Sequence, residues 1–90
     1  MPRVEAIVFG NVQGVGYRDF VSRVAASIGV NGFVRNLPNG TVEVVAEGGK
    51  EEIKELLHSL EQGPSLSCVS GVKTSWSDKT EGLKGFSIKY

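Results

Sequence analysis

The sequence predicts an α+β fold in which two helices cover one face of an antiparallel sheet. Apolar residues alternate with a period of two in five short segments and recur at helical spacing in two longer ones. These segments follow one another in the order β-α-β-β-α-β, with a short strand at the end. Helices and strands in this order bury the apolar faces of both helices against one side of a sheet.

The first half of the chain contains a strand and a helix joined by a glycine-rich turn. The pattern predicts a strand from Val4 to Phe9, which leads into a turn at Gly10. From Tyr17 to Ile28 the period becomes helical, and Gly29 supplies a stop signal. The apolar face of this helix consists of Tyr17, Phe20, Val21, Val24, Ala25 and Ile28.

Two strands joined by a hairpin form the middle of the chain. The pattern predicts strands from Gly32 to Asn36 and from Thr41 to Glu47. Between them, Asn39-Gly40 is a strong signal for a tight hairpin turn.

The second half repeats the alternation of helix and strand. Residues 50–62 form a helix, which the Gly63-Pro64 pair ends. Its apolar face consists of Ile53, Leu56, Leu57 and Leu60. Alternation then predicts a fourth strand at residues 72–76 and a final strand at 86–90, separated by a polar loop at 78–85.

This order of elements is a split β-α-β, or ferredoxin-like, sandwich. The expected order of the core strands is 4-1-3-2, with the C-terminal strand at an edge. We find no repeat, low-complexity stretch or linker, so residues 1–90 are expected to form a single domain.

Composition narrows the class of protein. Ten basic and ten acidic residues cancel, which counts against a general nucleic-acid binder. No apolar run approaches the length of a membrane span, and no signal peptide is evident. The single cysteine, Cys68, excludes an internal disulfide, suits the cytoplasm and is expected to be partly buried. We therefore expect a cytoplasmic monomer with no membrane or nucleic-acid partner.

The most informative segment is the glycine loop, residues 10–18, which reads Gly-Asn-Val-Gln-Gly-Val-Gly-Tyr-Arg. Glycines let successive backbone N–H groups converge, and such a concavity in front of a helix N-terminus binds anions. Arg18 adds a permanent charge with a planar fork that matches phosphate oxygens. The loop is therefore interpreted as a phosphate cradle, although the glycines alone would favour a loop that only turns the chain.

A second segment, residues 32–42, reads Gly-Phe-Val-Arg-Asn-Leu-Pro-Asn-Gly-Thr-Val. Together the two segments resemble the motifs of the acylphosphatase family, Gly-x-Val-Gln-Gly-Val-x-Phe-Arg and Gly-aromatic-Val-basic-Asn-x-x-x-Gly-x-Val. The resemblance extends to the length and strand pattern, and so spans nearly the whole chain. One departure is Tyr17, where the family usually has Phe.

The resemblance implies a hydrolase that splits acyl phosphates into a carboxylate and inorganic phosphate, which would also act as an inhibitor. Arg18 and Asn36 would be the catalytic residues: Arg18 would bind two phosphate oxygens and Asn36 would hold the attacking water. The backbone would wrap the phosphate at Gln13, Gly14, Val15, Gly16, Tyr17 and Arg18. The resemblance implies no metal and no cofactor, and the physiological acyl phosphate stays undetermined.

Each candidate also has a structural interpretation. Arg18 would also suit a solvated helix face, and Asn36 would also suit the start of a turn. Trp76 and Phe33 are expected in the core, Phe33 beneath the site, and His58 is expected to be exposed without a role. The alternative functions are a non-catalytic module that binds a phosphorylated ligand or, from the basic-Gly-aromatic run at residues 84–86, an RNA-binding domain of the same topology.

Overall fold

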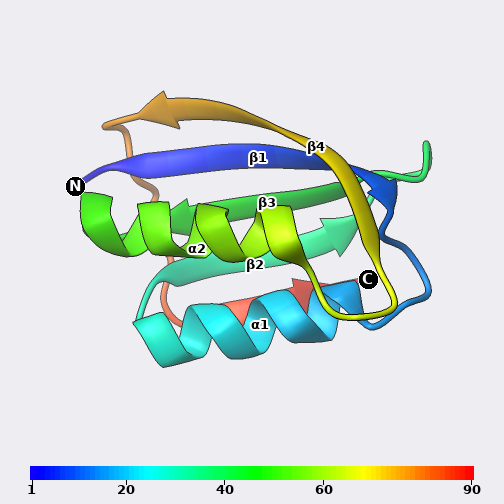
Figure 1. Cartoon of the computed structure of the whole chain (residues 1–90). Coiled ribbons are helices and arrows are strands. Elements are labelled where there is room, and N and C mark those ends of the chain that lie inside the picture. Colours follow the sequence, from blue (N-terminus) through cyan, green and yellow to red (C-terminus); the bar gives the residue numbers. More distant parts are fainter.

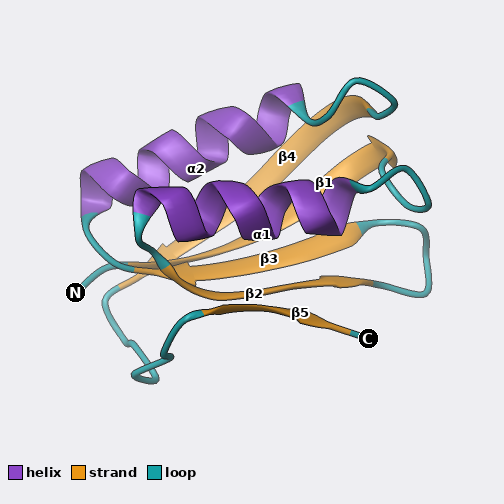
Figure 2. Cartoon of the chain, turned by 90° about the horizontal axis from the view of Figure 1, so that it is seen from below, coloured by secondary structure: helices purple, strands orange, loops and turns teal.

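The computed structural model describes residues 1–90, with two helices on one face of a five-stranded sheet (Figure 1). Figure 2 shows the same layers edge-on, with no helix on the other face of the sheet. The elements are β1 (Arg3–Asn11), α1 (Tyr17–Ile28), β2 (Asn31–Asn36), β3 (Val42–Glu47), α2 (Lys50–Gln62), β4 (Cys68–Ser77) and β5 (Phe86–Lys89). This arrangement confirms the predicted α+β, ferredoxin-like class.

The strands lie in the order β4-β1-β3-β2-β5, which confirms both the core order and the edge position of the last strand. The four core strands are antiparallel, as predicted, but β5 pairs with β2 in parallel, so the whole sheet is mixed. The reason is the connection between β4 and β5. This connection starts and finishes at the same end of the sheet while it passes from the β4 edge to the β2 edge (Figure 2). The strand β5 therefore runs antiparallel to β4, and this direction is parallel to β2.

The core lies between the helices and the sheet and contains fifteen buried apolar residues. Alternate residues of β1, Val4, Ala6 and Val8, are fully buried there, as the period of two requires. The predicted helix faces are confirmed. Their buried members are Tyr17, Val21, Ala25, Ile53, Leu56 and Leu60, and Phe20, Val24, Ile28 and Leu57 pack against them.

A buried carboxylate anchors the connection between β4 and β5. Glu47, only 4% exposed, accepts a hydrogen bond from Arg3 Nη1 at 2.6 Å and from the backbone N–H groups of Glu81 and Leu83 at 2.7 and 3.0 Å. Burial alone would raise the pKa of Glu47, but these hydrogen bonds and the charge of Arg3 together lower it below its ordinary value. Glu47 thereby fixes where β5 begins.

The edge strand β4 differs most from the predictions. It begins at Cys68 rather than at residue 72, because it pairs with β1 beyond an irregularity between Phe9 and Gly10. Cys68 is exposed, and Trp76 is 40% exposed rather than in the core. Both corrections follow from the edge position, where Val69 and Val72 are the side chains of β4 that pack against the core.

None of the helices is long and apolar enough to span a membrane.

Candidate active site

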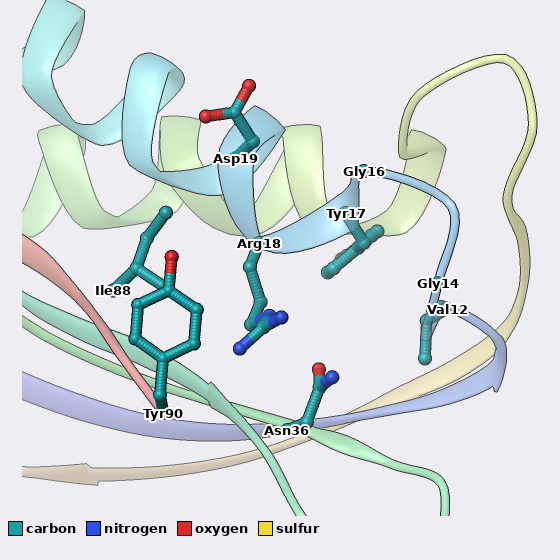
Figure 3. A pocket seen from close by; sticks show the side chains of 9 residues that line it. All are labelled: Val12, Gly14, Gly16, Tyr17, Arg18, Asp19, Asn36, Ile88 and Tyr90. Carbon is teal, nitrogen blue, oxygen red and sulfur yellow. The ribbon is translucent and has the colours of Figure 1, made fainter.

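A cavity of about 170 Å³ lies where the glycine loop enters α1, beside the end of β2 (Figure 3). Five of the predicted site residues line it: Gly14, Gly16, Tyr17, Arg18 and Asn36. The fold therefore brings the two motifs, which are separate in the sequence, to one cavity.

The glycine loop turns through two left-handed residues. The φ angles of Gly14 and Gly16 are 73° and 78°, values that other residues adopt at a cost. A Cβ at either position would meet no atom within 4 Å, so backbone conformation rather than space requires glycine here. Gly16 is also the N-cap of α1 and supplies no side-chain acceptor to the first turn. The first turn of α1, which lines the cavity, therefore keeps N–H groups without a side-chain acceptor at the positive end of the helix dipole.

Arg18 carries the positive charge of the cavity. It lies in the first turn of α1, half-buried, and forms no ion pair with a carboxylate. Its Nη1 makes a long contact with the carbonyl oxygen of Lys89, at 3.5 Å, and its guanidinium lies over the Tyr90 ring. Asp19 pairs with Arg23 at 3.5 Å, and its carboxylate points away from Arg18 in Figure 3. The charge of Arg18 is thus held in place without being neutralised.

Asn36, the last residue of β2, faces the Arg18 guanidinium in Figure 3. Its Oδ1 is buried and has no hydrogen-bond partner. Leaving a buried acceptor unpaired costs about 1–3 kcal/mol, which a hydrogen bond from a bound molecule would offset.

Three predicted residues point their side chains elsewhere. Val15 packs against the core, and the buried Tyr17 donates its hydroxyl to the carbonyl oxygen of Leu60 at 2.8 Å. That bond satisfies the hydroxyl by which Tyr17 departs from the family motif, and burial raises the pKa of the phenol. Gln13 does not line the cavity, since its side chain turns toward the β2–β3 hairpin. Any contact of Gln13 or Val15 with a ligand would have to come from the backbone.

Four lining residues were not identified from the sequence: Val12, Asp19, Ile88 and Tyr90. Alternation along the final strand did place Ile88 and Tyr90 on one face, but it gave no sign that this strand lies beside β2. Only the parallel pairing of β2 and β5 brings them to the cavity.

Two further residues considered in the sequence analysis, Phe33 and His58, lie outside the cavity. Phe33 is on the opposite face of the sheet from the buried Val34, and its ring centroid lies 4.0 Å from Lys89 Nζ. The prediction that Phe33 lies in the core is therefore wrong, and its support of the site stays a prediction. His58 is exposed on α2, as predicted, and contacts Gln62. The structure contains no group of three or more His, Cys, Asp or Glu side chains placed to hold a metal ion.

The cavity thus combines a cation without a carboxylate partner, the N-terminus of α1 and one neutral amide, a set that suits a tetrahedral anion. Comparison with known proteins agrees with this chemistry. The family model described as acylphosphatase matches residues 4–88.

Individual relatives extend the match to the whole chain. A protein of Thermus thermophilus named acylphosphatase is 51% identical over 88 residues, covering 98% of this chain and 99% of the relative. One of Thermococcus kodakarensis with the same name is 48% identical and covers 98% of each chain. The crystal structure of acylphosphatase from Bacillus subtilis superimposes with a TM-score of 0.98, at 36% identity and full coverage of both chains.

Proposed function

The chain belongs to the acylphosphatase family and hydrolyses acyl phosphates, and we propose that it does so in the cavity between the glycine loop and Asn36. The observation that carries this proposal is the pairing of two side chains across one cavity. Arg18 brings a charge that no carboxylate neutralises, and Asn36 faces it with a buried, unpaired oxygen. The substrate is an acyl phosphate and the product inorganic phosphate.

The glycine loop and Arg18 would bind the phosphate. The N–H groups of residues 13–18 would contact the phosphate oxygens, and Arg18 would bind two of them through its planar fork. An acyl phosphate is a mixed anhydride with a good leaving group, so positioning and charge stabilisation are the main requirements of the reaction. The loop and the guanidinium meet both requirements without moving any proton.

Asn36 would position the water. Its carboxamide oxygen would accept a hydrogen bond from the attacking water and hold that water in line with the bond to the acyl oxygen. No carboxylate or imidazole faces Asn36, because Asp19 is turned toward Arg23 and His58 lies on α2. The proton of the water would therefore pass to a phosphate oxygen of the substrate itself.

The remaining expectations concern the whole molecule. We propose that residues 1–90 form a single domain that acts as a monomer in the cytoplasm, without metal, cofactor or nucleic-acid partner. The balance of ten basic and ten acidic residues supports the absence of nucleic acid.

The test is hydrolysis of benzoyl phosphate by wild type, Arg18→Ala and Arg18→Lys. Loss of one preorganised contact with a transition state lowers turnover by about 10²–10³-fold, and we expect at least this for Arg18→Ala. Lysine should rescue poorly, since it lacks the bidentate fork. The matched control is Arg23→Ala, on the same helix and exposed, which should retain full activity. Wild-type turnover in folded Arg18→Ala would overturn the site assignment.

A further inference from the structure

The side chain of Gln13 joins the glycine loop to the β2–β3 hairpin. Its Nε2 donates to the carbonyl oxygens of Leu37 and Thr41, both at 2.8 Å, so both hydrogens of the amide are used. Leu37 directly follows Asn36 in the chain. One side chain of the phosphate-binding loop thus holds the turn that presents the water-positioning residue.

No other hydrogen bond joins residues 10–18 to residues 37–41. The ladder between β1 and β3 ends at the pair Val8–Val42, and beyond it β1 pairs with β4 alone. The glycine loop therefore has no backbone pairing with the hairpin. Without Gln13, the distance between loop and hairpin would depend on packing alone.

We infer that Gln13 is a positioning residue, which holds the Asn36 carboxamide and the Arg18 guanidinium at the separation that one phosphate and its attacking water require. This inference rests on the proposed roles of Arg18 and Asn36. Its own content is that Gln13 acts through Asn36 and not on the phosphate. The geometry supports this, because the Gln13 side chain does not line the cavity and its amide is saturated by the hairpin.

The two accepting groups are carbonyl oxygens, so only a donor can replace the Gln13 amide. Gln13→Glu keeps the size of the side chain but sets a carboxylate against two carbonyl oxygens. Gln13→Lys provides an ammonium group, which can donate to both. Activity in the order Gln, Lys, Glu would therefore follow donor chemistry rather than side-chain volume.

The experiment measures kcat and KM for benzoyl phosphate and Ki for inorganic phosphate, well below the melting temperature of each variant. Misplacing a reacting group by about 1 Å lowers rates by roughly 10²-fold, so Gln13→Ala and Gln13→Glu should lower kcat by about 10- to 100-fold. The Ki of phosphate should stay within about threefold of wild type, because the cradle itself is intact. Gln13→Lys should recover part of kcat.

The matched control is Asn39→Ala. Asn39 Oδ1 accepts from the backbone N–H and hydroxyl of Thr41, so this change removes bonds within the hairpin but leaves its bridge to the loop. The kcat of Asn39→Ala should stay within about threefold of wild type, because this residue is not expected to act on the reaction. If Asn39→Ala and Gln13→Ala lose kcat equally, Gln13 only stabilises the hairpin and the inference is wrong.

A double-mutant cycle separates this inference from the proposed function. Once Asn36 is absent there is nothing left for Gln13 to position, so adding Gln13→Ala to Asn36→Ala should change kcat by less than about threefold. Fully additive losses would overturn the role of Gln13 alone. Wild-type kcat in Asn36→Ala would overturn the role of Asn36, and the role of Gln13 with it.

Discussion

The guanidinium carbon of Arg18 lies 4.8 Å from the centroid of the Tyr90 ring. An aromatic face attracts a cation without neutralising it, because the attraction comes from the ring quadrupole. A carboxylate in the same place would compete with the phosphate for the guanidinium. The Tyr90 ring, itself exposed, therefore attracts the Arg18 side chain and leaves its charge available.

Removing the Tyr90 ring should weaken substrate binding modestly. An exposed cation–π contact contributes about 0.5–1 kcal/mol, so Tyr90→Ala should raise KM by roughly two- to fivefold. Tyr90→Phe keeps the ring and should match wild type. Steady-state kinetics on benzoyl phosphate give the answer, and an unchanged KM in Tyr90→Ala would mean that packing alone orients Arg18.

Removing the Asn36 amide should damage the chemical step and spare binding. Asn36→Ala should lower kcat by about 10²-fold while KM stays within a few-fold, the pattern of a contact made mainly in the transition state. Asn36→Asp should also be poor, because its charge would repel the phosphate. Asn31→Ala, at the other end of β2, serves as the matched control and should keep its kcat. A raised KM with intact kcat in Asn36→Ala would make Asn36 a binding residue instead.

Replacing Gly14 should weaken phosphate binding through the backbone alone. A side chain at this φ of 73° costs about 1–2 kcal/mol, although it meets no neighbouring atom. We expect Gly14→Ala to raise the Ki of phosphate by about 5- to 30-fold, and Gly14→Val to abolish competitive inhibition. Gly71→Ala is a suitable control, since Gly71 has equal space in an ordinary strand conformation. Normal phosphate inhibition of Gly14→Val would reduce Gly14 to a turn residue.

Chelation should leave the rate unchanged. The positive potential of the cavity comes from Arg18 and backbone N–H groups, and no group of three metal-ligating side chains exists in the structure. Turnover measured before and after dialysis against a strong chelator should agree. Activity that is lost on chelation and restored by one divalent cation would contradict the proposed mechanism.

Acid should destabilise the fold through Glu47. Because its pKa is lowered in the folded protein, the stabilisation is complete above the ordinary value of 4.5 and is lost as the pH falls through the folded pKa. Glu47→Gln should lower the free energy of unfolding by about 1.5–3 kcal/mol at pH 7, and less at pH 3. Urea unfolding of both proteins at several pH values measures this difference.

The matched control for Glu47 is Glu51→Gln, whose side chain is exposed. It should change stability little at any pH. If the difference between wild type and Glu47→Gln is the same at pH 3 and pH 7, then the carboxylate charge of Glu47 does not stabilise the fold.

Local signals were sufficient to predict both helices and to identify five of the nine residues that line the cavity. The helix from Tyr17 to Ile28 has the predicted bounds, because its period and the Gly29 stop are both local. Arg18 and Asn36, which both line the cavity, were predicted because each belongs to a motif at the end of an element. Their meeting at one cavity follows from the strand order, which the order of the elements predicts.

The remaining features depend on contacts between distant segments. The predicted strand order places the fourth strand at one end of the core sheet, but alternation at residues 72–76 does not show that its pairing extends back to Cys68 or that Cys68 and Trp76 are exposed. The position of Tyr90 depends on the connection between β4 and β5, which crosses the sheet and donates two backbone hydrogen bonds to the Glu47 carboxylate. The two bonds of Gln13 join residues 24 and 28 positions apart, which no local pattern encodes.

The central position of β1 has a consequence for how the protein forms. On both sides β1 is paired by strands that follow it in the chain, and the later of them, β4, places Ser77 opposite Arg3. Such long-range pairing slows folding, because loop-closure entropy must be overcome before native contacts compensate for it. The glycine loop directly follows β1 and stays unconstrained until the sheet has closed around that strand. A nascent chain would therefore acquire catalytic activity only in the last events of folding, after most of its residues have left the ribosome.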